Sequence, residues 1–232
     1  HGDELVVAEA MTLPVPEGLT PVEAAALPEG LATAWWNLVR LGRLGDGERV
    51  LVPAANSGMG HLIVQAALAR GAEVIAGTRG DRWHARLSEL GAVPVATDAA
   101  DAGERLQRAA PGGVDVIVDL VGAANAPLYT SALRRDGRWL SVGILGGTDI
   151  ELSLRDVIRQ RWTVTGSSIR SLSAAEKRIA IAGVRADLWP AVALDRIRPH
   201  IHRIVPADRR DEAFAVMEDG GFFGKIVLER NI

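Results

Sequence analysis

The sequence predicts an α/β fold built around a doubly wound parallel sheet of six strands. Apolar runs of strand length alternate with runs of helical pattern from residue 49 to residue 169. The strand-like runs are apolar almost throughout, which is typical of parallel strands buried on both faces. The first run also leads through a glycine-bearing turn into an alanine-rich helix. With 48% apolar and 24% charged residues, the composition is that of a folded domain with a sizeable core.

The elements of this alternation follow one another at short spacing. We expect strands at residues 49–54, 72–78, 92–96, 114–122, 137–145 and 162–169. Helices are expected between them at residues 60–70, 82–90, 102–110, 125–135 and 152–160. Parallel strands joined by right-handed helical crossovers form a sheet covered on both faces. Six such strands predict a dinucleotide-binding domain of the Rossmann type.

The segment before the first strand is expected to be helical. Thr20 and Glu23 form a capping box with Pro21 at the first helical position, and the helix should end before Pro28. A second helix is expected through Ala32–Leu41, closed by Gly42.

The pattern changes after Arg170. A capping box at Ser173–Glu176 opens a long helix whose pattern is interrupted at Pro190. Strands at 198–207 and 224–230 flank a helix at 208–218 and have no partner in the alternation. We expect them to form a second sheet together with Leu5–Ala8. The dinucleotide-binding domain is therefore predicted at residues 17–170, with residues 1–16 and 171–232 belonging to a second domain and its connecting helix.

The turn after the first strand reads AANSGMG and holds Gly58 and Gly60. Glycine is needed where a backbone turns tightly or approaches a diphosphate, and the helix N-terminus behind it attracts anions. Ala54 and Ser57 stand where glycine would be more permissive. Two glycines alone are equally compatible with a turn that binds nothing. The position after the first of six alternating strands favours a cofactor loop.

The end of the second strand points to the kind of dinucleotide. A site for NAD usually has a carboxylate there, but this strand ends in Gly77 and Thr78. Arg79 and Arg82 follow, and guanidinium groups suit a 2′-phosphate. Asp81 is a competing acid, better explained as a cap on the helix expected to start at Arg82. The sequence therefore favours NADPH.

Composition and charge exclude several other classes of protein. The net charge is −3 with no basic stripe, so no nucleic-acid partner is expected. No apolar run reaches the roughly 18–20 residues of a membrane span, so no membrane partner is expected. The chain has no cysteine, which excludes disulfides and thiolate metal sites within it. We expect a cytoplasmic location.

Six stretches resemble the medium-chain dehydrogenase/reductase superfamily and, within it, the zeta-crystallin-like NADPH:quinone oxidoreductases. They are VPEGLTPVEAAALPEGLATAWWNLV, ERVLVPAANSGMGHLIVQAALARGAEVIA, VDVIVDLVGA, GRWLSVGILGG, TVTGSSIRSLSAAEKRIA and GKIVLE. They span nearly the whole chain in family order. The resemblance implies a second, mainly β, GroES-like substrate domain to which the flanking segments belong. It also implies that most of this N-terminal domain, roughly another 100 residues, lies outside the chain.

The resemblance also implies roles for individual residues. Backbone groups of the glycine loop would hold the diphosphate, and the loop after the second strand would face the 2′-phosphate. Other residues would approach the nicotinamide or its carboxamide, and Lys225 would reach the cofactor unless it is merely solvated. The implied cofactor-binding residues are Thr33, Ser57, Gly58, Met59, Gly60, Thr78, Arg79, Arg82, Gly143, Ile144 and Lys225.

The implied function is a zinc-independent, NADPH-dependent oxidoreductase that transfers hydride to a quinone or other conjugated carbonyl acceptor. A homodimer through residues 162–169 is implied as well, and no catalytic residue is assigned. One alternative is a protein or fragment that binds NADPH without catalysis. Another is a relative of the zinc alcohol dehydrogenases, with Glu29 where those enzymes have a cysteine ligand. The short-chain dehydrogenases are excluded, because they need a lysine four residues after a tyrosine and Tyr129 is followed there by Leu133.

Three histidines are candidates for ligand binding. His61, next to Gly60, is interpreted either as a donor to a phosphate or as a solvated residue at a helix start. His200 and His202 have a spacing found in metal sites, but with no third ligand nearby a packed or exposed pair is favoured. Trp35 and Trp36 are interpreted as core or domain-interface residues.

Overall fold

The computed structural model describes residues 5–230 and contains the predicted sheet. Its six parallel strands lie in the order β3-β2-β1-β4-β5-β6, which is the order of dinucleotide-binding folds. The strands are β1 (Arg49–Val52), β2 (Glu73–Thr78), β3 (Val93–Ala96), β4 (Val114–Asp119), β5 (Leu133–Ser141) and β6 (Thr163–Gly166). The chain order reverses between β1 and β4, so a ligand crevice is expected at the carboxyl ends of these two strands.

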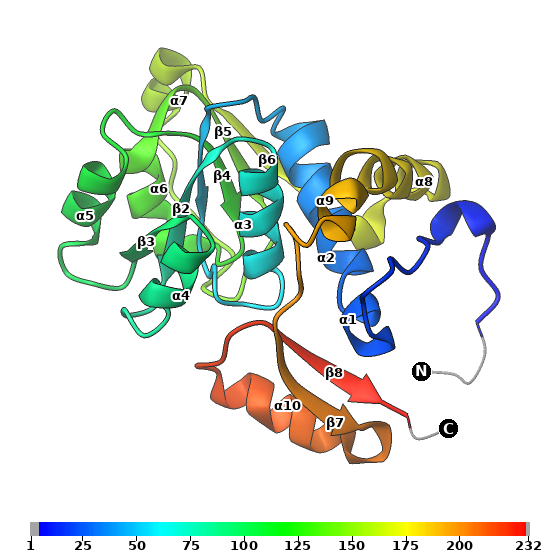
Figure 1. Ribbon diagram of the computed structural model, residues 1–232. Coiled ribbons are helices and arrows are strands. Elements are labelled where there is room, and N and C mark those ends of the chain that lie inside the picture. Colours follow the sequence, from blue (N-terminus) through cyan, green and yellow to red (C-terminus); the bar gives the residue numbers. More distant parts are fainter. Residues whose placement is uncertain (1–4, 231–232) are drawn as a thin grey trace.

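Helices cover both faces of this sheet (Figure 1). They are α3 (Gly60–Ala69), α4 (His84–Glu89), α5 (Ala102–Ala109), α6 (Ala126–Ala132) and α7 (Leu154–Gln160). Alternate residues of β1 point to opposite faces: Val50 and Val52 pack with α3, whereas Leu51 packs with α5 and α6. This partition follows from the two-residue repeat of a strand, and it produces two separate buried cores.

Of the two N-terminal helices, the second packs on the same face as α3, and the first lies against the C-terminal residues. These are α1 (Pro21–Ala25), which has the predicted capping box, and α2 (Pro28–Trp35), which continues as a π-helix over Trp36–Leu41. Trp35 and Trp36 are buried, as predicted, and the Trp35 indole N–H donates to the Asp187 carboxylate at 2.6 Å. This bond ties α2 to the helical run of α8 (Ala174–Gly183), a π-helix at Val184–Leu188 and α9 (Trp189–Ala193).

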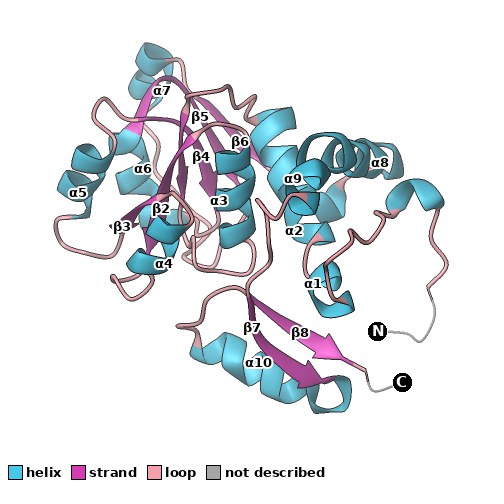
Figure 2. Cartoon of the chain, viewed as in Figure 1, coloured by secondary structure: helices cyan, strands magenta, loops and turns pink. Residues whose placement is uncertain are grey.

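The C-terminal residues form a small β-α-β unit below the large sheet (Figure 2). Its strands β7 (Ile201–Pro206) and β8 (Lys225–Glu229) pair in parallel, with α10 (Arg210–Asp219) between them in the chain. These elements match the prediction closely. The predicted strand at Leu5–Ala8 is wrong, because these residues pair with no strand and Leu5 and Val6 are exposed.

Two predicted boundaries around β5 are also wrong. The helix expected at 125–135 ends at Ala132, because Leu133 pairs with Val114 in the sheet. The strand expected to reach residue 145 ends at Ser141. Beyond Ser141, Gly143 packs directly against the main chain of Leu120. At this point the strands end and the loops that border the crevice begin.

Candidate cofactor site

The turn between β1 and α3 brings two backbone segments into direct contact. A Cβ on Gly60 would collide with the Ala54 carbonyl oxygen and lie 2.8 Å from the Ala55 Cα. Only glycine therefore allows α3 to approach the end of β1 this closely. The hydroxyl of Ser57 accepts a hydrogen bond from the Gly60 amide at 2.9 Å, so this serine binds the first amide of α3.

Ala54 adopts the left-handed conformation, with φ of +53°. This confirms that Ala54 occupies a position where glycine would be more permissive. We expect Ala54→Gly to raise the free energy of unfolding by up to about 1 kcal/mol, because relief of the Cβ strain exceeds the added entropy of the unfolded chain. Urea denaturation measures this change.

Ala215→Gly is the matched control, since Ala215 is exposed in the middle of α10. There the same change should lower stability by about 1 kcal/mol. A loss of stability in both variants would contradict the assignment of strain to Ala54.

The part of the loop next to α3 leaves two backbone donors unpaired. Within residues 5–230, the amides of Gly58 and Met59 form no hydrogen bond with the protein, whereas Ser57 N donates to Ala54 O and Gly60 N to Ser57. These two free amides stand at the N-terminus of α3, where the helix dipole favours an anion. Of the four residues expected at the diphosphate, only Gly58 and Met59 thus have free amides.

A segment from the C-terminal unit lies against this loop. The Asn56 side chain donates to Phe222 O at 2.8 Å, and Asn56 O accepts from Gly224 N at 2.9 Å. The Lys225 Cδ atom lies 3.1 Å from the position of a Cβ on Gly58. Burial lowers the pKa of Lys225, and the charge of Glu29 partly opposes this effect. Lys225 is half-buried against Gly58 and is not a solvated surface lysine.

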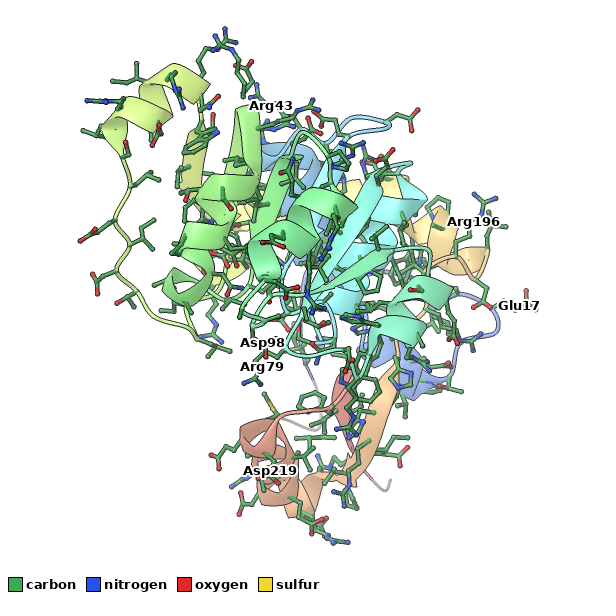
Figure 3. The ribbon with its side chains drawn as sticks, turned by 90° about the vertical axis from the view of Figure 1, so that its left-hand side faces the viewer. Glu17, Arg43, Arg79, Asp98, Arg196 and Asp219 are labelled. Atoms are coloured by element: carbon green, nitrogen blue, oxygen red, sulfur yellow. The ribbon has the colours of Figure 1, made fainter. Side chains whose placement is uncertain are left out.

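The loop after β2 places two arginines beside the same C-terminal segment. Arg82 donates to Gly221 O at 2.9 Å and stacks on the Trp83 ring. Arg79 projects toward the C-terminal unit (Figure 3), and its Nη2 atom lies 3.5 Å from the position of a Cβ on Gly220. The exposed guanidinium of Arg79 is thus available to a ligand at this edge.

Thr78 lies differently from the two arginines. Its side chain is buried, and its hydroxyl donates to Gly80 O at 2.8 Å and contacts His84 Nε2 at 3.0 Å. This side chain shapes the loop from inside, and the arginines form its outer surface.

The loops after β4 and β5 border the other half of the crevice. Gly143 donates its amide to Asp119 O at 3.0 Å, while Ile144 is 61% exposed. Thr33 in α2 is buried and donates its hydroxyl to Glu29 O at 2.9 Å, which leaves its oxygen free to accept. Within residues 5–230, no hydrogen bond joins Thr33 to these loops.

The chain is similar to proteins of a known family. A family model described as zinc-binding dehydrogenase matches residues 58–183, which is more than half of the chain. The chain belongs to this family. Its similarity to several further members places it in the medium-chain dehydrogenase/reductase superfamily, as the resemblance implied.

Individual relatives cover the chain almost completely. Human synaptic vesicle membrane protein VAT-1 homolog is 27% identical over 97% of this chain, and mouse prostaglandin reductase-3 is 28% identical over 97%. The quinone oxidoreductase of Thermus thermophilus, solved also with NADPH, is 30% identical, with a TM-score of 0.79, and the match covers 93% of this chain and 69% of that one. The chain spans 61% and 62% of the lengths of the first two relatives, so it corresponds to part of each.

His61, His200 and His202 pack against aromatic rings. His61 is fully buried, its Nδ1 lies 2.9 Å from Ser57 O, and its Nε2 accepts from His200 N at 3.2 Å. Both ring nitrogens are therefore occupied, and neither interpretation of His61, phosphate donor or solvated residue, holds. The rings of His200 and His202 pack against Phe223 and Phe222, respectively.

Residues 5–230 show neither a metal-binding cluster nor a membrane span. This range holds no group of three or more His, Asp or Glu side chains that could bind a metal ion. Glu29 is exposed in the first turn of α2, the position of a dipole-compensating acid. None of the helices in this range is both long and apolar enough to cross a membrane.

Sequence reasoning missed three residues that organise the site. Asn56 and Phe223 join the glycine loop to the C-terminal unit, and Asp119 joins the loops after β4 and β5. For Asp119, the sequence offered one indication, a charged residue at the end of the apolar run that forms β4. Asn56 and Phe223 carry none, because Phe222 and His61, their respective partners across the site, lie more than 150 residues away in the chain.

Proposed function

We propose that this chain binds NADPH at the carboxyl edge of the sheet and forms the cofactor-binding part of an oxidoreductase. The acceptor of the hydride would be a conjugated carbonyl compound such as a quinone or an alkenal. The observation that carries the proposal is the pair of free amides of Gly58 and Met59 beside Lys225, at the N-terminus of α3. This donor set fits the charge and hydrogen-bonding needs of a diphosphate.

The remaining residues fit the two ends of the same cofactor. Arg79 and Arg82 would pair with the 2′-phosphate, and Thr78 would shape that loop from within. At the other end, Gly143 and Ile144 would border the nicotinamide, and Thr33 would accept from its carboxamide. Ser57 and Gly60 would support the diphosphate by fixing the loop that presents the free amides.

The nicotinamide would supply the hydride, that is, two electrons and a proton. The residues of this chain would orient the cofactor and keep one of its faces open beside Ile144. Similarity to a quinone oxidoreductase and to prostaglandin reductase-3 supports a conjugated acceptor and a zeta-crystallin-like subgroup. A zinc-independent reaction is part of this proposal, and equimolar zinc by elemental analysis of the full-length protein would contradict it.

A protein that binds NADPH without catalysis is the second candidate, because the chain spans only part of its relatives. Fluorescence titration with NADPH, followed by NADPH oxidation with a quinone, separates the two in the full-length protein. Binding with oxidation is expected. Binding without oxidation of any conjugated carbonyl would favour the second candidate, and absence of binding would contradict both.

Selectivity for NADPH is expected to depend on Arg79. Arg79→Ala should weaken NADPH binding about 10–100-fold and leave NADH binding unchanged, because only NADPH has the 2′-phosphate. Titration of both nucleotides measures the ratio. Arg155→Ala, which removes an exposed arginine from α7, is the matched control and should change neither affinity. An equal loss for both nucleotides would refute the assignment.

The domain division and the assembly are also proposals. Residues 17–170 would form the cofactor domain, and residues 1–16 and 171–232 would belong to the substrate domain and its connecting helix. A cytoplasmic homodimer paired through β6 is proposed because β6 is an edge strand with Val164 exposed. A monomeric mass in sedimentation of the full-length protein would refute the dimer.

A further inference from the structure

We propose that Asp119 is a positioning residue for the nicotinamide half of the site, acting through the loops after β4 and β5. This inference rests on the proposed function, because it assigns those loops to the nicotinamide. Asp119 is the last residue of β4 and is fully buried. It therefore cannot face a ligand itself, and any effect on one must pass through its neighbours.

The carboxylate of Asp119 organises the loop that follows β4. Its Oδ1 atom accepts from the amides of Val121 and Gly122 and from the Tyr129 hydroxyl, each at 2.8 Å. Its Oδ2 atom accepts from the Trp139 indole N–H at 3.2 Å. No cation pairs with it among residues 5–230. Four donors thus compensate a buried charge that would be costly without them.

The hydroxyl of Tyr129 remains protonated and donates to Asp119. Burial raises the pKa of its hydroxyl, and the adjacent Asp119 carboxylate raises it further. The hydroxyl therefore keeps its proton at neutral pH. Its ring also packs edge-on against Trp139, with centroids 5.2 Å apart, so α6 and β5 are held at one place by the same carboxylate.

The main chain of Asp119 holds the second loop. Its carbonyl oxygen accepts from the amides of Val142 at 2.8 Å and Gly143 at 3.0 Å. The segments after β4 and β5 then bond to each other along their backbones, at 2.7 Å for Gly146 N to Val121 O and 2.9 Å for Ala124 N to Gly146 O. One residue thus sets the position of both loops.

The contact between these loops tolerates little displacement. Gly122 has φ of +92°, and a Cβ there would lie 2.6 Å from the Gly147 carbonyl oxygen. A shift of the carboxylate would move Gly122 against Gly147 and, through them, Gly143 and the exposed Ile144. The residues at the adenosine half of the site lie on other loops, so that half should be unaffected.

The test replaces the carboxylate while keeping its shape. In Asp119→Asn the amide nitrogen would face the Trp139 indole N–H, and two donors cannot pair. We expect the affinity for 2′,5′-ADP, which carries the adenosine end, to stay within about twofold, and the affinity for NADPH to fall about tenfold. Amide hydrogen exchange in the ligand-free chain should quicken about tenfold at residues 121–124 and 142–147.

Two further variants keep the test decisive. Asp211→Asn, at an exposed position of α10, is the matched control and should change none of these values. If Asp119→Asn does not fold, Tyr129→Phe is used instead, because it removes only one hydrogen-bond donor. This variant should lower the affinity for NADPH about threefold and leave the affinity for 2′,5′-ADP unchanged.

The possible outcomes separate the two proposals. Unchanged NADPH affinity, or equal losses for NADPH and 2′,5′-ADP, would overturn the positioning role of Asp119. A wild-type chain that binds neither nucleotide would overturn the proposed function. Hydrogen exchange in the ligand-free protein would then still decide whether Asp119 anchors the two loops.

Discussion

Gly60→Ala is expected to lower the free energy of unfolding by about 3 kcal/mol and to abolish NADPH binding. The added Cβ would collide with the Ala54 carbonyl oxygen and approach the Ala55 Cα to 2.8 Å. Both obstacles are main chain and cannot rotate away, so α3 would have to move off the end of β1. That movement would displace the amides of Gly58 and Met59. Urea denaturation and fluorescence titration measure the two effects.

Gly103→Ala is the matched control for this substitution. Gly103 also lies in the first turn of a helix, α5, but no atom lies within 4 Å of the position its Cβ would take. Alanine there should raise stability by up to about 1 kcal/mol, because it favours the helical conformation. Similar effects of the two substitutions would refute the close approach at Gly60.

Stability is expected to fall by about 3 kcal/mol between pH 6.5 and pH 4 on account of His61 alone. Burial lowers the pKa of His61 to about 4, and the hydrogen bond to Ser57 opposes this only in part. Above pH 6.5 the ring is neutral in both the folded and the unfolded chain. As the pH falls, the unfolded chain takes up the proton first, which favours unfolding until the folded chain is protonated too. Urea denaturation at a series of pH values measures this slope.

A variant at His61 separates the effect of its protonation on stability from the effect of protonating Asp and Glu side chains in the same pH range. His61→Gln should be less stable at neutral pH, because it perturbs the contacts with Ser57 and His200, but should lose less stability between pH 6.5 and pH 4. His202→Gln is the control, because it removes an exposed histidine that makes no contact with Ser57 O or His200 N. An unaltered slope in His61→Gln would contradict the assignment.

The destabilisation at low pH has a structural consequence for the site. Protonated His61 would lose the acceptor that pairs with His200 N, next to the Phe223 ring at 5.8 Å. The same contacts join the C-terminal unit to the glycine loop. We therefore expect the loss of stability to be accompanied by displacement of Lys225 from the glycine loop.

Much of the fold could be predicted from local patterns. The capping boxes at Thr20 and Ser173 formed as expected, because each is a contact between residues three apart. The six parallel strands appeared in order, because continuous apolar runs have no alternative to burial on both faces. The need for glycine at position 60 was also visible, since the turn and the helix adjoin in sequence.

The sequence alone determined the order of strands and helices, the type of domain and the position of its glycine loop, because short-range periodicity and turn chemistry encode them. The tertiary structure decided which residues complete the site. Leu5–Ala8 does not form a strand, because these residues pair with no other strand. Strand β5 begins at Leu133, because Leu133 pairs with Val114 of β4. His61 is buried by a segment more than 130 residues away, and Asn56 is bonded to Phe222. These contacts join distant parts of the chain, and no local pattern records them.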